Sequence, residues 1–88
     1  MPPQTPNDPH AIALSALAAT LTDERRAHRF LDVTGIGTDE LRRRAGDATL
    51  LAAVLSFLEA HEPDLIAVAE QMEVAPEQLV RARMELER

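Results

Sequence analysis

The most apolar stretch of this sequence runs from Asp47 to Leu58 and reads Asp-Ala-Thr-Leu-Leu-Ala-Ala-Val-Leu-Ser-Phe-Leu. On a helical wheel its large side chains fill an arc of about 160°: Leu50, Leu51, Val54, Leu55, Phe57 and Leu58. The opposite side carries small residues, namely Thr49, Ala52, Ala53, Ser56 and Ala60. This pattern predicts a helix over about residues 47–61 that packs against its neighbours on more than one side.

Cap residues, prolines and glycines divide the rest of the chain into further helices. A first helix is expected from Pro9 to about Thr20, and Thr22 and Thr38 are expected to begin the second and third. The core face predicted for the first helix consists of Leu14, Leu17, Ala18 and Leu21, and that for the second includes Phe30 and Val33. Pro63 and Pro76 mark the starts of two more helices. No segment alternates with period two, so we predict an all-α fold: a compact bundle of five or six short helices around the central helix at 47–61.

The composition bounds the class of protein. A chain of 88 residues suits one domain, for which we expect residues 8–88, preceded by a proline-rich, disordered tail at 1–7. The absence of cysteine excludes disulfides and thiolate chemistry. No signal peptide is visible and the longest apolar run is too short to span a bilayer, so we expect a cytoplasmic protein with no membrane partner.

Residues that could carry catalysis or bind a metal are sparse. The histidines, His10, His28 and His61, lie too far apart for a helical ligand pair, and His61 is expected to be half-buried at the end of the central helix. The serines Ser15 and Ser56 lack a nucleophile motif. We therefore expect no enzyme activity, no metal site and no cofactor.

Arginine is the only basic residue besides histidine, and six of the nine arginines lie within residues 23–44. Clustered arginines can bind a phosphate, an acidic peptide or RNA. The alternative is a solvated face neutralised by the five acids of the same segment. A smaller apolar patch is expected on the last helix. The candidate interaction surface therefore consists of Arg25, Arg26, Arg29, Arg42, Arg43, Arg44, Val80 and Met84.

The spacing of small and apolar residues in 64–86 is typical of a helix-turn-helix. Ala69 and Leu79 fit its small and apolar positions, and Arg81 and Arg83 could then face a DNA groove. Two features oppose this interpretation. Glu73 stands where the turn usually has glycine, and residues 62–88 contain seven acids against three arginines.

The chain as a whole resembles a family of short, bacterial, all-helical proteins catalogued as a domain of unknown function, number 3572. The matching segments are Arg29-Phe-Leu-Asp-Val-Thr-Gly35, Asp39-Glu-Leu-Arg42, Leu50-Leu-Ala-Ala-Val-Leu-Ser-Phe-Leu58 and Ala75-Pro-Glu-Gln-Leu79. The similarity covers about residues 12–86. It implies a compact helical domain in the cytoplasm and supplies no activity or site residues.

The function hypothesis from sequence is a small, non-enzymatic protein–protein interaction or regulatory module with an unknown protein partner. The alternative is helix-turn-helix-like DNA binding through residues 64–86, although the acidic balance makes nucleic acid the less favoured partner. A third possibility is self-association through the last helix, so we expect a monomer or a weak homodimer.

Overall fold

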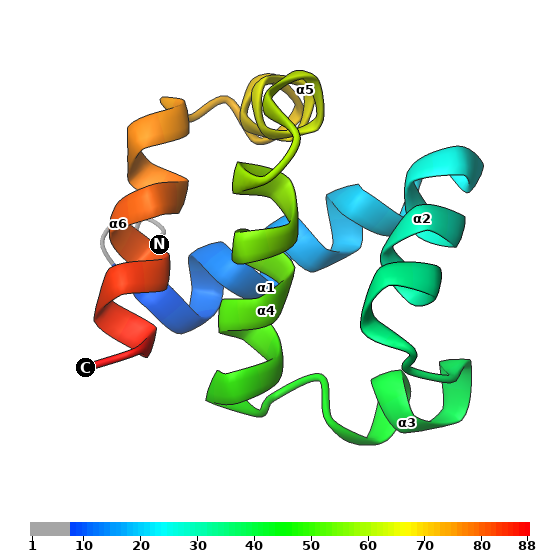
Figure 1. Cartoon of the computed structure of the whole chain (residues 1–88). Helices are drawn as coiled ribbons and strands as arrows, with labels where there is room; N and C mark the ends of the chain where they lie inside the picture. Colours follow the sequence, from blue (N-terminus) through cyan, green and yellow to red (C-terminus); the bar gives the residue numbers. More distant parts are fainter. Residues whose placement is uncertain (1–7) are drawn as a thin grey trace, which may run out of the picture.

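Six helices form the described part of the chain, residues 8–88, in a computed structural model (Figure 1). Their bounds are α1 Pro9–Leu21, α2 Glu24–Thr34, α3 Thr38–Arg43, α4 Ala48–Glu59, α5 Glu62–Met72 and α6 Pro76–Leu86. No strand occurs between residues 8 and 88. The predicted all-α class is confirmed, whereas the disordered tail predicted at 1–7 lies outside the described residues.

Helix α4 stands at the centre of the molecule, with α6 on one side, α2 on the other and α1 crossing it (Figure 1). Asp47 caps its first turn, because the carboxylate accepts a hydrogen bond of 2.8 Å from the Thr49 N–H. All six large side chains of the predicted apolar arc are buried. The helix ends at Glu59, two residues earlier than predicted.

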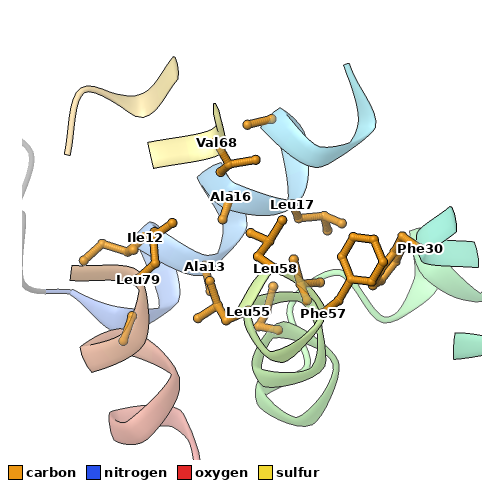
Figure 2. Packing of buried hydrophobic residues seen from close by; sticks show 14 of the residues in the cluster. Ile12, Ala13, Ala16, Leu17, Phe30, Leu55, Phe57, Leu58, Val68 and Leu79 are labelled. Atoms are coloured by element: carbon orange, nitrogen blue, oxygen red, sulfur yellow. The ribbon is translucent and has the colours of Figure 1, made fainter. Parts of the chain in front are cut away.

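The core is formed where α1 and α6 cover the apolar arc of α4 (Figure 2). Ala13 and Ala16 of α1 are completely buried, and their small side chains let α1 lie close to its neighbours. Leu79 projects from α6 toward the same cluster, and Val68 of α5 closes it from another side. Phe30 of α2 meets Phe57 of α4 edge to face, with ring centroids 5.3 Å apart.

The face that α1 buries differs from the predicted one. Leu14, Ala18 and Leu21 are exposed, and only Leu17 of the predicted set is buried. The buried face instead carries Ile12, Ala13, Ala16, Ala19 and Thr20. Because α1 is apolar on nearly every side, its sequence does not orient it, and the close approach of α4 and α6 to its alanines decides which face turns inward.

Three helix starts also differ from the predictions. Asp23, not Thr22, caps α2 by accepting from the Arg26 N–H at 3.0 Å, while the Thr22 hydroxyl donates to the Ala19 carbonyl at 2.7 Å. Gly37 is the N-cap of α3, so Thr38 is its first helical residue. His61 is exposed and precedes α5 instead of extending α4.

Two residues adopt the left-handed conformation at helix ends. Gly35 closes α2 at φ 71°, and its N–H donates to the Leu31 carbonyl. Glu73 closes α5 at φ 62° and turns the chain toward α6. A residue with a Cβ is strained in this conformation, so the Glu73 turn is held by the packing of the helices on either side.

Candidate functional site

Arg26, predicted to belong to an exposed basic surface, is buried with 7% of its surface exposed. Its guanidinium reaches back to α1 and donates to the carbonyls of Ala19, at 2.9 Å, and Thr20, at 3.4 Å. These carbonyls belong to the last turn of α1, where carbonyls lack N–H donors from a following turn, although the Ala19 carbonyl also accepts from the N–H and the hydroxyl of Thr22. Arg26 therefore joins α2 to the end of α1 and is not part of an exposed patch.

Arg29 lies at the contact between α2 and α5. Its guanidinium pairs with the carboxylate of Asp64, which is buried, and its Cζ atom lies 6.0 Å from the centroid of the Phe57 ring. The Nδ1 atom of His61 is 3.2 Å from the same carboxylate. Arg29 thus has a structural partner for its charge.

The arginines of α3 and its end are neutralised to different degrees. Arg44 bridges Glu40, at 3.1 Å, and Asp47, at 3.2 Å. The hydrogen bond to Glu40, with the one to Asp47, raises the pKa of Arg44. Arg42 lies 3.9 Å from Asp39, and both side chains are exposed.

Arg25 and Arg43 are exposed and make no ion pair with any residue between 8 and 88. Of the six predicted arginines, four have partners within the molecule. A hollow of about 530 Å³ beside α2 includes Arg25 and Arg29 together with Glu24 and Asp32. Because its charges are of both signs, this hollow is not a concentrated site for an anion.

The strip predicted on α6 is partly accessible. Met84 has 54% of its surface exposed, and Val80 is half-buried. Arg81 is exposed beside them, but Arg83 is drawn toward α4, where it pairs with Glu59 and, at 2.7 Å, with Glu87. The charge of Arg83 is therefore compensated within the molecule.

The small face of α4, predicted to be covered by another helix, instead forms the floor of an open groove of about 660 Å³. We call this feature the α4 groove. Its floor consists of Thr49, Ala52, Ala53, Ser56 and Ala60, and its walls include Val33 and Thr34 of α2 and Leu86 and Glu87 of α6. Phe57 lies between floor and wall.

Val33 is the most exposed large apolar residue of the described chain, at 68%. Sequence reasoning placed it in the core because it shares the side of α2 that carries Phe30 and Thr34. The side chain instead stands at the edge of the α4 groove, where none of the helices α1–α6 covers it. The small residues of α4 were the sequence signal for this groove, but their pattern does not tell whether a helix of the same chain fills it.

Two ionic clusters adjoin the α4 groove near its ends. At one end Arg44 bridges Glu40 and Asp47, two residues before Thr49. At the other, Arg83 bridges Glu59, the neighbour of Ala60, and Glu87 of the wall. Each cluster has two carboxylates and one guanidinium, and hence a formal charge of −1.

Hydrogen bonds in and beside the two clusters shift the pKa values of Asp47 and Arg83. The hydrogen bond from the Thr49 N–H, with help from Arg44, lowers the pKa of Asp47 from its ordinary value of 3.8. The hydrogen bond to Glu59 raises the pKa of Arg83. The carboxylate of Asp47 and the guanidinium of Arg83 therefore remain charged at neutral pH.

Residues 8–88 contain neither a cluster of metal ligands nor a membrane-spanning helix. No three histidine, aspartate or glutamate side chains gather closely enough to hold a metal ion. Within the same range, no helix combines the length and apolar character needed to cross a membrane.

The described residues thus form a small all-helical domain with an open, largely apolar groove along α4. The family model described as "Protein of unknown function (DUF3572)" matches residues 6–88, and the chain belongs to this family. Neither a curated protein nor a solved structure matches the chain.

Proposed function

We propose that this protein is a small, non-enzymatic interaction module of the cytoplasm that binds a protein partner in the α4 groove. The observation that carries the proposal is the exposure of Val33 beside an open floor of small residues. The volume of about 660 Å³ lies within the range of about 300–1,000 Å³ that is typical of ligand clefts.

The groove differs from the scattered apolar exposure of ordinary surfaces because its apolar residues are contiguous and come from three helices. Val33, Leu86 and the alanines of α4 enclose one space. Covering such a surface removes apolar area from water and is favourable by about 25 cal/mol per Å² before the costs of association. The surface therefore supports a binding role more strongly than the partly neutralised arginines do.

A matched pair of serine substitutions tests the proposal. Ser56 is exposed in the groove floor, and Ser15 is exposed on α1 outside it. The Ser56→Trp variant fills the groove, whereas Ser15→Trp adds the same side chain elsewhere. We expect a partner that is captured from native lysate, identified by mass spectrometry and purified to bind wild type and Ser15→Trp alike in calorimetry.

Binding to Ser56→Trp is expected to weaken at least tenfold, about 1.4 kcal/mol. Equal binding by all three proteins would show that the groove is not the contact surface. The Val80→Glu variant then tests the strip on α6. Loss of binding there and not in Ser56→Trp would move the site to Val80 and Met84.

DNA binding through residues 64–86 is the second candidate function. It is supported by one observation, the short left-handed turn at Glu73 between α5 and α6. Titration of mixed-sequence duplex DNA over a salt series tests it, since electrostatic binding is strongest at low salt. We expect no binding even at low salt, and a salt-dependent complex that Arg81→Glu abolishes would reverse the choice between the two functions.

A further inference from the structure

The α4 groove also has features that define its occupant, an inference that depends on the proposed function. We infer that the groove receives a single amphipathic helix of a partner protein, with aliphatic residues on the face that enters and lysine or arginine at the end of that face nearest Glu87.

The secondary structure of the occupant follows from the groove walls. The floor and both walls are helices whose backbone groups are already hydrogen-bonded within each helix. An extended segment lying there would find no backbone donors or acceptors, and its own peptide groups would lose water without replacement. A helix satisfies its own backbone, so it can enter an apolar groove with little polar desolvation.

The dimensions of the groove agree with a helical occupant. The floor runs along α4 from Thr49 to Ala60, which at 1.5 Å per residue is roughly 16 Å, or about three helical turns. Because Ala53 and Ser56 are small, the axis of an entering helix can lie close to that of α4. The space above them accepts larger aliphatic side chains, with Val33 and Leu86 as lateral contacts.

The charge of the occupant follows from the two ionic clusters. Glu87 is the charged residue that lines the groove, and no arginine lines it among the described residues. The Arg83 cluster leaves a charge of −1 beside Glu87, whereas the exposed Arg43 offsets the charge of −1 on the Arg44 cluster at the other end. A helix with a cation at one end of its entering face would place it near Glu87, where attraction between exposed charges stabilises binding modestly.

A second copy of this chain fits the groove less well. Helix α1 presents an exposed apolar stripe of Leu14, Ala18 and Leu21, but no lysine or arginine lies within Pro9–Leu21. The chain carries a formal net charge of −6, so two copies repel each other. These properties favour a cationic partner over self-association.

The test uses two synthetic helix-stabilised peptides of about 15 residues. Both carry the same leucine and alanine face, and they differ only in having lysine or glutamate at one flanking position. Each is titrated into the isotope-labelled full chain and followed by nuclear magnetic resonance. We expect the lysine peptide to shift the amide signals of Val33, Ala53 and Ser56.

The expected charge effect is about tenfold in Kd between the two peptides at low salt, because an attraction to Glu87 worth a few-fold for lysine becomes a repulsion of similar size for glutamate. The difference should shrink strongly near 1 M salt, where the Debye length is about 3 Å. Glu87→Gln is expected to weaken binding of the lysine peptide about threefold. Glu85→Gln, an exposed site two residues earlier on the same helix, is the matched control.

The outcomes separate this inference from the proposed function. Equal affinity for both peptides, with shifts confined to the groove, would overturn the cationic partner and leave the groove as a binding site. Failure of both peptides to shift groove signals, while a purified natural partner is blocked by Ser56→Trp, would overturn the helical occupant alone. If that partner also binds Ser56→Trp normally, the proposed function fails as well.

Discussion

One face of α4 is buried and the other lines an open groove, although both belong to one helix of twelve residues. On one face, Val54, Leu55 and Leu58 are completely buried against α1 and α6. On the other, Thr49, Ser56 and Ala60 face solvent along an open groove. Large apolar side chains hold the fold together, and small ones on the same helix leave a surface for other contacts.

This difference shows that neighbouring residues can have separate roles. Leu55 and Ser56 are adjacent in sequence, yet one lies in the core and the other in the groove floor. Arg25 and Arg26 form a similar pair on α2, one exposed and one buried. Substitutions at such pairs measure how completely folding and surface functions are separated.

The largest effect is expected at Leu55. The Leu55→Ala variant removes a side chain with no exposed surface, and such truncations cost about 2–5 kcal/mol through lost burial and the cavity that remains. Ser56→Ala, next to it, should change stability by less than about 0.5 kcal/mol. Urea unfolding measures both, and comparable losses at the two positions would contradict the separation of the two faces.

A pair of arginine substitutions on α2 tests the same separation of buried and exposed neighbours. Arg26→Met retains an apolar stem but leaves the Thr20 carbonyl without its donor, while the Ala19 carbonyl keeps its bonds from Thr22, so we expect a loss of about 1–3 kcal/mol. Arg25→Met, at the exposed neighbour, should leave the free energy of unfolding nearly unchanged. If Arg25→Met were the more harmful change, the structural role given to Arg26 would be wrong.

The turn at Glu73 offers a gain in stability. Glu73→Gly relieves the strain of a left-handed residue with a Cβ and should stabilise the protein by about 0.5–1 kcal/mol. The same replacement three residues earlier, Glu70→Gly, lies within α5 and should destabilise it by about 1 kcal/mol. Thermal unfolding measures whether each variant is stabilised or destabilised. If both substitutions change the stability in the same direction, backbone strain at Glu73 is excluded.

The smallest effect concerns pH. The pKa of Asp47 is lowered in the folded protein by the Thr49 N–H, so the unfolded chain binds this proton more readily. Its contribution to stability is complete above the ordinary pKa of 3.8 and is lost as the pH falls through the folded value. The pKa of Asp23 is lowered in the same way by the Arg26 N–H.

We therefore expect the melting temperature to fall more gently with acid in Asp47→Asn than in wild type. Asparagine still caps the helix but does not titrate. Circular dichroism melts between about pH 7 and pH 3 measure the slopes. Asp39→Asn, an exposed residue of α3, serves as the control and should follow wild type.

The sequence allowed the core face of α4 to be predicted because large and small residues segregate cleanly on its wheel. It did not allow the same for α1, where apolar residues surround the helix, and where Leu17 is buried with the alanines while Leu14 and Leu21 are exposed. Periodicity orients a helix only when a face of different character opposes the face of large apolar residues.

The candidate site was predictable only in part. The small residues of α4 were recognised, but whether a groove remained open depended on how far α2 and α6 lie from α4. The structural role of Arg26 had no local signal, since its acceptors are carbonyls of α1 six and seven residues earlier. An arginine side chain is long enough to reach several different acceptors, and only the folded structure shows which of them it contacts.

The packing of α6 against both α1 and α4 has a consequence for biosynthesis. Ile12 and Ala16 belong to α1, the first of the six described helices to be translated, yet their cover includes Leu79 and Ala82, which are translated after the other five. The core therefore cannot close while α6 is still being made. Nascent chains that stall before Leu79 would leave the inner face of α1 without its cover from α6.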